Sequence, residues 1–243
     1  MGVANATPIT FAQVEDTNTA NDLVWTNNGN GSATLNTAMA GGDAVTLNFE
    51  NVANLPSNLS ATLNAIETIN GGAGVTTNAL AKQTTIPTVG TYDTQSINSP
   101  LVIAYTLAGT SENLLTITIT PNATGAAGLT LAGFNGANGG SASSSNVGTP
   151  PPTYTETFTS DFLQFTQTAT LAAAWSFSAL NPTGGGTGLA VASDGLLASF
   201  TADETGTFSS DPPPIYVPEP GSFALLGAGL LGMTLVARRR SAF

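Results

Sequence analysis

The chain has 243 residues, of which 41% are hydrophobic and only 8% are charged, and it contains neither cysteine nor histidine. The missing residue types exclude disulfides, thiol and imidazole catalysis, and zinc ligation by cysteine or histidine. Residues 1–217 hold fourteen acids and one base, Lys82, so their formal charge is −13. This charge excludes nucleic acid as a partner, because phosphate binding needs clustered lysine and arginine.

Residues 1–20 show no secretory signal peptide, since they lack a positive start followed by an apolar core. The composition is nevertheless typical of exported β proteins, with many threonine, serine, asparagine and glycine residues. We therefore expect that a signal was removed or lies upstream of this sequence.

Alternation of apolar and polar residues recurs along the body and predicts β-strands with one apolar and one hydroxyl-rich face. The clearest runs are residues 45–49, 101–107, 115–120 and 175–179, and residues 60–69 are predicted as a further strand. Glycine and asparagine clusters between the runs are typical of tight turns. The pattern predicts an all-β fold, an antiparallel, jelly-roll-like β-sandwich.

Two segments interrupt the strand pattern. Residues 136–152 are rich in glycine and serine and end in three prolines, which favours a long surface loop. Residues 209–216 contain three consecutive prolines, which favour an extended polyproline II spacer. We therefore predict a β-sandwich domain over residues 1–208, a proline-rich spacer over 209–216, and a tail over 217–243.

Two adjacent acid pairs, Glu15–Asp16 and Asp203–Glu204, are candidate catalytic carboxylates. Glycoside hydrolysis uses two carboxylates about 5–10 Å apart, but neighbours on a strand point to opposite faces. Such a pair would act together only in a loop, and we expect both pairs to be solvated acids in turns. The sequence therefore predicts that the body is not an enzyme.

No cofactor is expected. Oxygen ligands are abundant, and Asp93, Asp194 and Asp203 lie near turn sequences, so structural Ca²⁺ is the metal that this composition favours. The sequence has no calcium-loop motif, and we assign no metal ligand. Most aromatic residues of a sandwich belong to its core, but Trp25 precedes an Asn/Gly-rich turn and is the candidate glycan contact.

The tail has three parts. They are the motif Val217, Pro218, Glu219 and Pro220, the uncharged run Gly221–Ala237, and the cluster Arg238, Arg239 and Arg240. At ~1.5 Å per residue the run gives a helix about 25 Å long, close to the ~30 Å hydrocarbon core of a bilayer. We therefore predict one transmembrane helix over residues 221–237, with the arginines as a cytoplasmic clamp and the body outside. A buried core helix is the alternative, but it leaves the arginine cluster unexplained.

This tail resembles the PEP-CTERM sorting signal of exopolysaccharide-producing Gram-negative bacteria. The resemblance covers about residues 217–240, and Pro218, Glu219 and Pro220 match the recognition motif. It implies export, recognition of Pro-Glu-Pro by the membrane peptidase exosortase, cleavage near that motif, and transfer to the cell surface or matrix. Proline restricts the backbone and removes a hydrogen-bond donor, so this segment is suited to be an extended substrate.

The sequence thus predicts an exported, non-enzymatic protein of the cell surface or biofilm matrix. Its precursor would be anchored transiently in the inner membrane and then cleaved by exosortase. The first alternative is a carbohydrate-binding module that contacts exopolysaccharide, and the second is a carboxylate-dependent glycan hydrolase.

Overall fold

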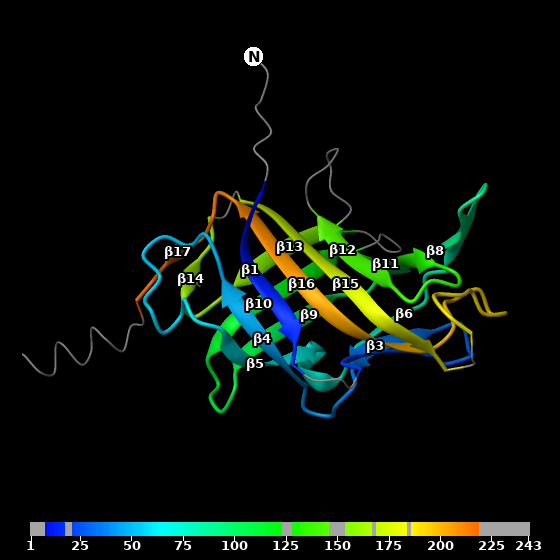
Figure 1. Ribbon diagram of the computed structural model, residues 1–243, viewed down its shortest axis with the longest axis horizontal. Coiled ribbons are helices and arrows are strands. Elements are labelled where there is room, and N and C mark those ends of the chain that lie inside the picture. The colour runs from blue at the N-terminus through cyan, green and yellow to red at the C-terminus, as the bar shows by residue number, and fades with distance from the viewer. Residues whose placement is uncertain are drawn as a thin grey trace, which may run out of the picture.

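The computed structural model describes residues 8–17, 21–122, 128–145, 154–166, 169–183 and 186–218. These ranges contain strands and one short 3₁₀ turn, η1 (Figure 1). The bounds are β1 Ile9–Asp16, β2 Leu23–Asn27, β3 Ala33–Thr37, β4 Asp43–Phe49, β5 Leu63–Ile69, η1 Asn70–Gly72, β6 Val75–Thr77, β7 Lys82–Ile86, β8 Gly90–Ile97, β9 Leu101–Leu107, β10 Asn113–Pro121, β11 Leu129–Phe134, β12 Gly140–Ser145, β13 Tyr154–Thr159, β14 Leu163–Gln164, β15 Thr170–Pro182, β16 Phe200–Asp211 and β17 Ile215–Tyr216.

One large sheet dominates the described residues. Its main path runs β13-β10-β9-β5-β4-β1-β16-β15-β12-β11-β8-β7, and β2, β3 and β6 branch from β16. The sheet curls until its two halves face each other, with β1, β16 and β15 in front of β9, β10 and β13 (Figure 1). Phe11 of β1 and Phe208 of β16 lie 5.7 and 6.5 Å from Phe158 of β13, between ring centroids. The predicted all-β class is confirmed, but as one curled antiparallel sheet, because the ladder through β4, β1 and β16 is continuous.

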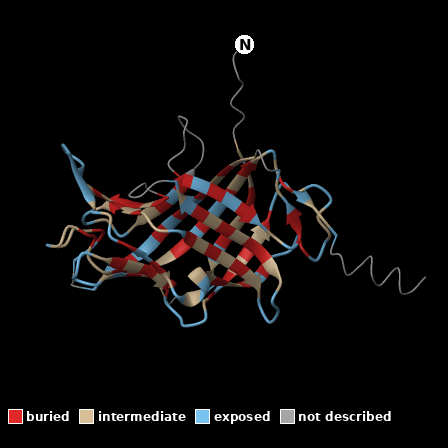
Figure 2. Ribbon diagram, turned by 180° about the vertical axis from the view of Figure 1, so that it is seen from behind, coloured by how far each residue is buried: buried red, intermediate tan, exposed pale blue. Residues whose placement is uncertain are grey.

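The strands form where the sequence alternates, and burial follows the same period of two. Inward positions of β10 and β13 are buried, whereas their threonines face outward, and the ribbon shows this as a chequered pattern of buried and exposed residues (Figure 2). The strand expected within residues 60–69 is β5, whose buried positions include Ala65 and Ile69.

The loop predicted over residues 136–152 is wrong in its first half, which contains β12. This strand lies between β11 and β15 and places Ala142 directly opposite Trp175. The strand needs small residues, because a Cβ added at Gly140 would lie 2.9 Å from the carbonyl oxygen of Ala132. The glycine that made this segment resemble a turn is therefore required by the close approach of the neighbouring strand β11.

The spacer predicted over residues 209–216 also differs from the structure. β16 continues to Asp211, Ser210 is fully buried, and the chain returns to the body as β17. The alternation of the preceding residues extends past residue 208 and keeps the backbone in the sheet. Among the described residues, no helix is long and apolar enough to cross a membrane, and the helix predicted over 221–237 lies outside them.

Candidate functional site

The exit of the chain is held against the body by a small second sheet. β17 pairs with β14 through Leu163–Tyr216 and Gln164–Ile215, and Ile215 forms an isolated bridge with Ala53 in the loop after β4. The amide of Val217 then donates to the carbonyl oxygen of Phe162 at 2.8 Å. The sequence motif therefore begins at Val217, the residue directly after β17, whose amide is still hydrogen-bonded to the body.

The turn before β14 supports this exit. The hydroxyl oxygen of Ser160 accepts the amides of Phe162 and Leu163 at 3.1 and 3.2 Å, and the Asp161 carboxylate accepts the amide of Asn113 at 2.7 Å. Of the predicted motif, Val217 is half-buried and Pro218 is exposed. Glu219, Pro220, the run to Ala237 and the arginines Arg238, Arg239 and Arg240 lie outside the described residues.

A pair of carboxyl groups lies in the core between the two halves of the sheet. Glu67 of β5 and Glu204 of β16 are 1% and 3% exposed, and their side chains are hydrogen-bonded to each other. The Tyr105 hydroxyl donates to Glu67 Oε1 at 3.2 Å, and Trp175 Nε1 donates to the Tyr105 hydroxyl oxygen at 3.1 Å. The result is a chain of polar groups from β15 through β9 to β5 and β16.

Burial controls the charge of this pair. It raises the pKa of Glu67 well above the usual value for a glutamate, and the neighbouring Glu204 charge raises it further. Burial also raises the pKa of Glu204, while its bond from Glu67 opposes the rise. Glu67 is therefore the protonated donor, because two neighbouring carboxyl groups cannot both ionise in a desolvated site. Both side chains are buried within the core, so the arrangement is suited to holding strands together rather than to turning over a glycan.

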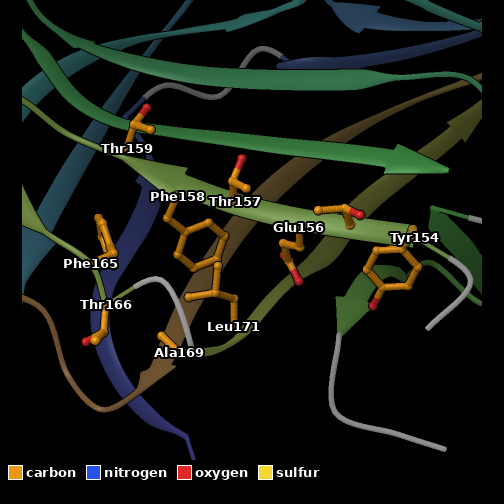
Figure 3. A pocket seen from close by; sticks show the side chains of 10 residues that line it. Tyr154, Glu156, Thr157, Phe158, Thr159, Phe165, Thr166, Ala169 and Leu171 are labelled. Carbon is orange, nitrogen blue, oxygen red and sulfur yellow. The ribbon is translucent and has the colours of Figure 1, made fainter. Parts of the chain in front are cut away.

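A groove runs along β13, an end strand of the main sheet path, and faces the start of β15 (Figure 3). Its volume is about 450 Å³. We call it the β13 groove, and its lining residues are Tyr154, Thr155, Glu156, Thr157, Phe158, Thr159, Phe165, Thr166, Ala169 and Leu171. Most of the threonines stand at its exposed rim, while Phe158 and Leu171 are buried.

Glu156 is the carboxyl group of this groove. It is 5% exposed and points to the same side of β13 as Phe158, toward Leu171 (Figure 3). Ser144 of β12 donates its hydroxyl hydrogen to Glu156 Oε1 at 2.6 Å. Burial raises the pKa of Glu156 to about 7, although the Ser144 bond lowers it. The group is thus poised to gain or lose a proton near neutral pH.

Trp25 is wrong as a candidate glycan contact. Its ring is fully buried, stacks on Phe200 with 6.3 Å between centroids, and donates Nε1–H to the carbonyl oxygen of Leu197 at 3.0 Å. The residue sits at an inward position of β2, where the alternation of the strand outweighs the nearby turn signal.

The prediction that the two acid pairs lie in turns is also wrong. Glu15 and Asp16 belong to β1, and Asp203 and Glu204 belong to β16. Because neighbouring strand residues face opposite ways, Glu204 enters the core while Asp203 stays on the outer face. Glu204 does meet a second carboxyl group, but that partner is Glu67.

The structure does not bring together the three aspartates considered for Ca²⁺. Asp93 is buried and accepts from Gln83 at 3.0 Å, whereas Asp194 accepts from Asn27 at 3.0 Å in a loop, a bond that lowers its pKa. Asp203 lies on β16. Within the described part of the chain, no group of three or more acidic side chains could hold a metal ion.

Sequence reasoning missed Glu67 and Glu156, although a signal for both existed. Glu67 alternates with the buried residues Ala65 and Ile69, and Glu156 alternates with Tyr154 and Phe158. Acids at inward positions of a strand are unusual because their burial is costly. Their position in the alternation therefore predicts that both acids are buried, but it does not identify the residues that they contact.

Comparison with known proteins concerns the tail. Residues 217–240 match the family model of the PEP-CTERM protein-sorting motif. No curated protein and no solved structure matches the chain. The match confirms the resemblance and supports an exosortase-targeted sorting signal, which implies export and processing of a membrane-anchored precursor.

Proposed function

We propose that this chain, which carries the PEP-CTERM sorting motif, is a non-enzymatic protein of the cell surface or extracellular matrix. Exosortase is its processing partner, and the inner membrane holds the precursor through the predicted helix over residues 221–237. The observation that carries the proposal is the match over residues 217–240 at the point where the chain leaves the folded body.

The placement of the carboxyl groups supports a body without catalysis. The close pair Glu67 and Glu204 lies in the core, at most 3% exposed. The described residues that line the β13 groove include one carboxyl group, Glu156, whereas glycoside hydrolysis uses two. Neither of these two arrangements favours the hydrolase alternative.

A test of the proposed role compares the natural chain with one that ends after Tyr216. We expect the natural chain in the extracellular matrix fraction of an exosortase-containing host, and the shortened chain outside that fraction, because it lacks the sorting motif. Equal amounts of both chains in the matrix would contradict a role that depends on sorting.

Contact with exopolysaccharide is a second candidate function, favoured by the outer face of the sheet. Uncharged residues of β12, β15 and β16 lie opposite one another in two rows. The rows are Ser141, Ser176 and Thr205, and Ser143, Ala174 and Thr207. Such a face can hydrogen-bond a neutral glycan without the cost of removing water from a charge.

This second candidate predicts that Ser176→Glu weakens retention of the chain on purified exopolysaccharide, because it places a charge in the middle of the face. The control Thr155→Glu adds the same charge at the rim of the β13 groove and should leave retention unchanged. Equal retention of natural chain and both variants would remove this candidate and leave the sorting proposal intact.

A further inference from the structure

We propose that the β13 groove binds a small organic ammonium ion that carries an apolar group. The ammonium pairs with the Glu156 carboxylate, and the apolar group packs against Phe158, Phe165 and Leu171. This inference depends on the groove alone, so it stands or falls independently of the sorting tail.

The first argument is an incomplete set of hydrogen bonds. Glu156 is 95% buried, and Ser144 satisfies its Oε1 atom at 2.6 Å, but Oε2 has no hydrogen-bond partner among the residues that the structure describes. Leaving a buried carboxylate oxygen without a donor destabilises the ionised group, because the oxygen has lost its hydrogen bonds to water. An N–H donor placed in the groove would complete the set, and the side chain already points into it (Figure 3).

The second argument is the shape and lining of the groove. A volume of about 450 Å³ lies within the range of small-molecule sites. Phe158 and Phe165 meet edge to face with 5.7 Å between their centroids, and Leu171 and Ala169 form the opposite side (Figure 3). These side chains offer apolar contact, and aromatic rings also attract a nearby cation.

The third argument decides the charge of the ligand. The described lining residues include no basic side chain, and their ionisable groups are Glu156 and Tyr154. Residues 1–217 carry a formal charge of −13, and a field of this sign attracts cations and repels anions. Burial holds the pKa of Glu156 at about 7. An ammonium ion stabilises the carboxylate form of Glu156, so its binding at or below neutral pH displaces the proton from Glu156.

The test uses the full chain in nanodiscs of zwitterionic lipid, with empty nanodiscs as the blank. The probes are 2-phenylethylammonium and the neutral alcohol of the same shape, 2-phenylethanol. Isothermal titration calorimetry in two buffers of different ionisation enthalpy measures affinity and proton release. We expect saturable binding of the ammonium ion, proton release at slightly acidic pH, and at least about tenfold weaker binding of the alcohol.

Three variants assign the effect to the groove. Glu156→Gln removes the charge with little change of shape, so it should weaken ammonium binding at least about tenfold and abolish proton release. Ala169→Phe fills the groove and should abolish binding, with circular dichroism showing that the fold persists. Glu15→Gln, an exposed acid on β1, is the matched control and should bind as the natural chain does.

Equal binding of the two probes would overturn the proposal, as would unchanged ammonium binding by Glu156→Gln. Absence of saturable binding at millimolar probe concentrations would also overturn it. None of these results bears on processing by exosortase, which is scored separately by the mass of the cleaved chain.

Discussion

The core around Tyr105 and the exit strand β17 are held to very different degrees. The core network joins β5, β9, β15 and β16 through hydrogen bonds between buried side chains. The exit is held by a two-residue pairing with β14, one isolated bridge and one further amide bond. The side chains that stabilise the body are therefore different from the residues of the sorting motif, and each set can be changed without changing the other.

This separation is tested most strongly at Glu219. Glu219→Ala should leave nearly all of the chain as uncleaved precursor in the inner membrane, because it removes the charged residue of the recognition motif. Immunoblots of membrane and extracellular fractions measure the outcome. The matched control Glu156→Gln removes one acid from the body and should be processed normally. Normal release of Glu219→Ala would place the sorting information elsewhere.

The next largest effect is the dependence of body stability on pH. The folded-state pKa of Glu156 is about 7 against a usual 4.5, so the folded body holds this proton more tightly than the unfolded chain does. The bound proton contributes about 3 kcal/mol to the free energy of unfolding of the body. This contribution is complete below pH 4.5 and is lost as the pH rises through about 7.

Urea unfolding of the cleaved body between about pH 4 and about pH 8 measures this loss. Glu156→Gln should flatten the profile by that amount, and the remaining slope reports other groups, including Glu67 and Glu204. An identical slope in the variant and the natural body would show that Glu156 is not the group responsible.

A smaller effect is expected from the core network. Tyr105→Phe removes one hydroxyl, so Trp175 Nε1 loses its acceptor and Glu67 Oε1 loses this donor. The loss should lower the free energy of unfolding by about 2 kcal/mol. Chemical denaturation measures the change. Tyr92→Phe is the control, because Tyr92 lies partly exposed on β8 beside Phe134, and equal losses in the two variants would refute the network's contribution.

The smallest effect concerns the exit. A chain that ends after Pro218 should be more stable than one that ends after Asp211 by about 1 kcal/mol, because the longer chain keeps the β14–β17 pairing and the Val217 amide bond. Thermal or denaturant unfolding of the two shortened chains gives the difference. Equal stabilities would show that residues 212–218 add nothing to the stability of the body, as expected if residues 212–216 of the predicted spacer act only as a spacer.

Local alternation predicted much of the fold, because strands with one buried face repeat every second residue. Leu115, Ile117 and Ile119 are buried as their pattern indicates. Long-range pairing was not predictable, since Glu67 and Glu204 are far apart in sequence and meet only because the sheet curls. β12 was missed because the close approach of β11 at Gly140 requires a small residue, and small residues otherwise indicate a loop.

The sorting motif was recognisable because its information is local and linear. The candidate site of the body was not, since Glu156, Ser144, Phe165 and Leu171 come from four separate segments. The prediction that Trp25 is an exposed glycan contact was wrong for the same reason. Its contacts with Leu197 and Phe200, which are distant in sequence, determine its burial, whereas the adjacent turn does not.

The most direct test of the account is the mass of the mature chain from the native host. We expect an extracellular body whose new C-terminus lies at or next to Pro218, Glu219 and Pro220, and a membrane-bound, uncleaved chain when exosortase is removed. An uncleaved chain in the water-soluble cytoplasmic fraction of the exosortase-containing host would contradict it.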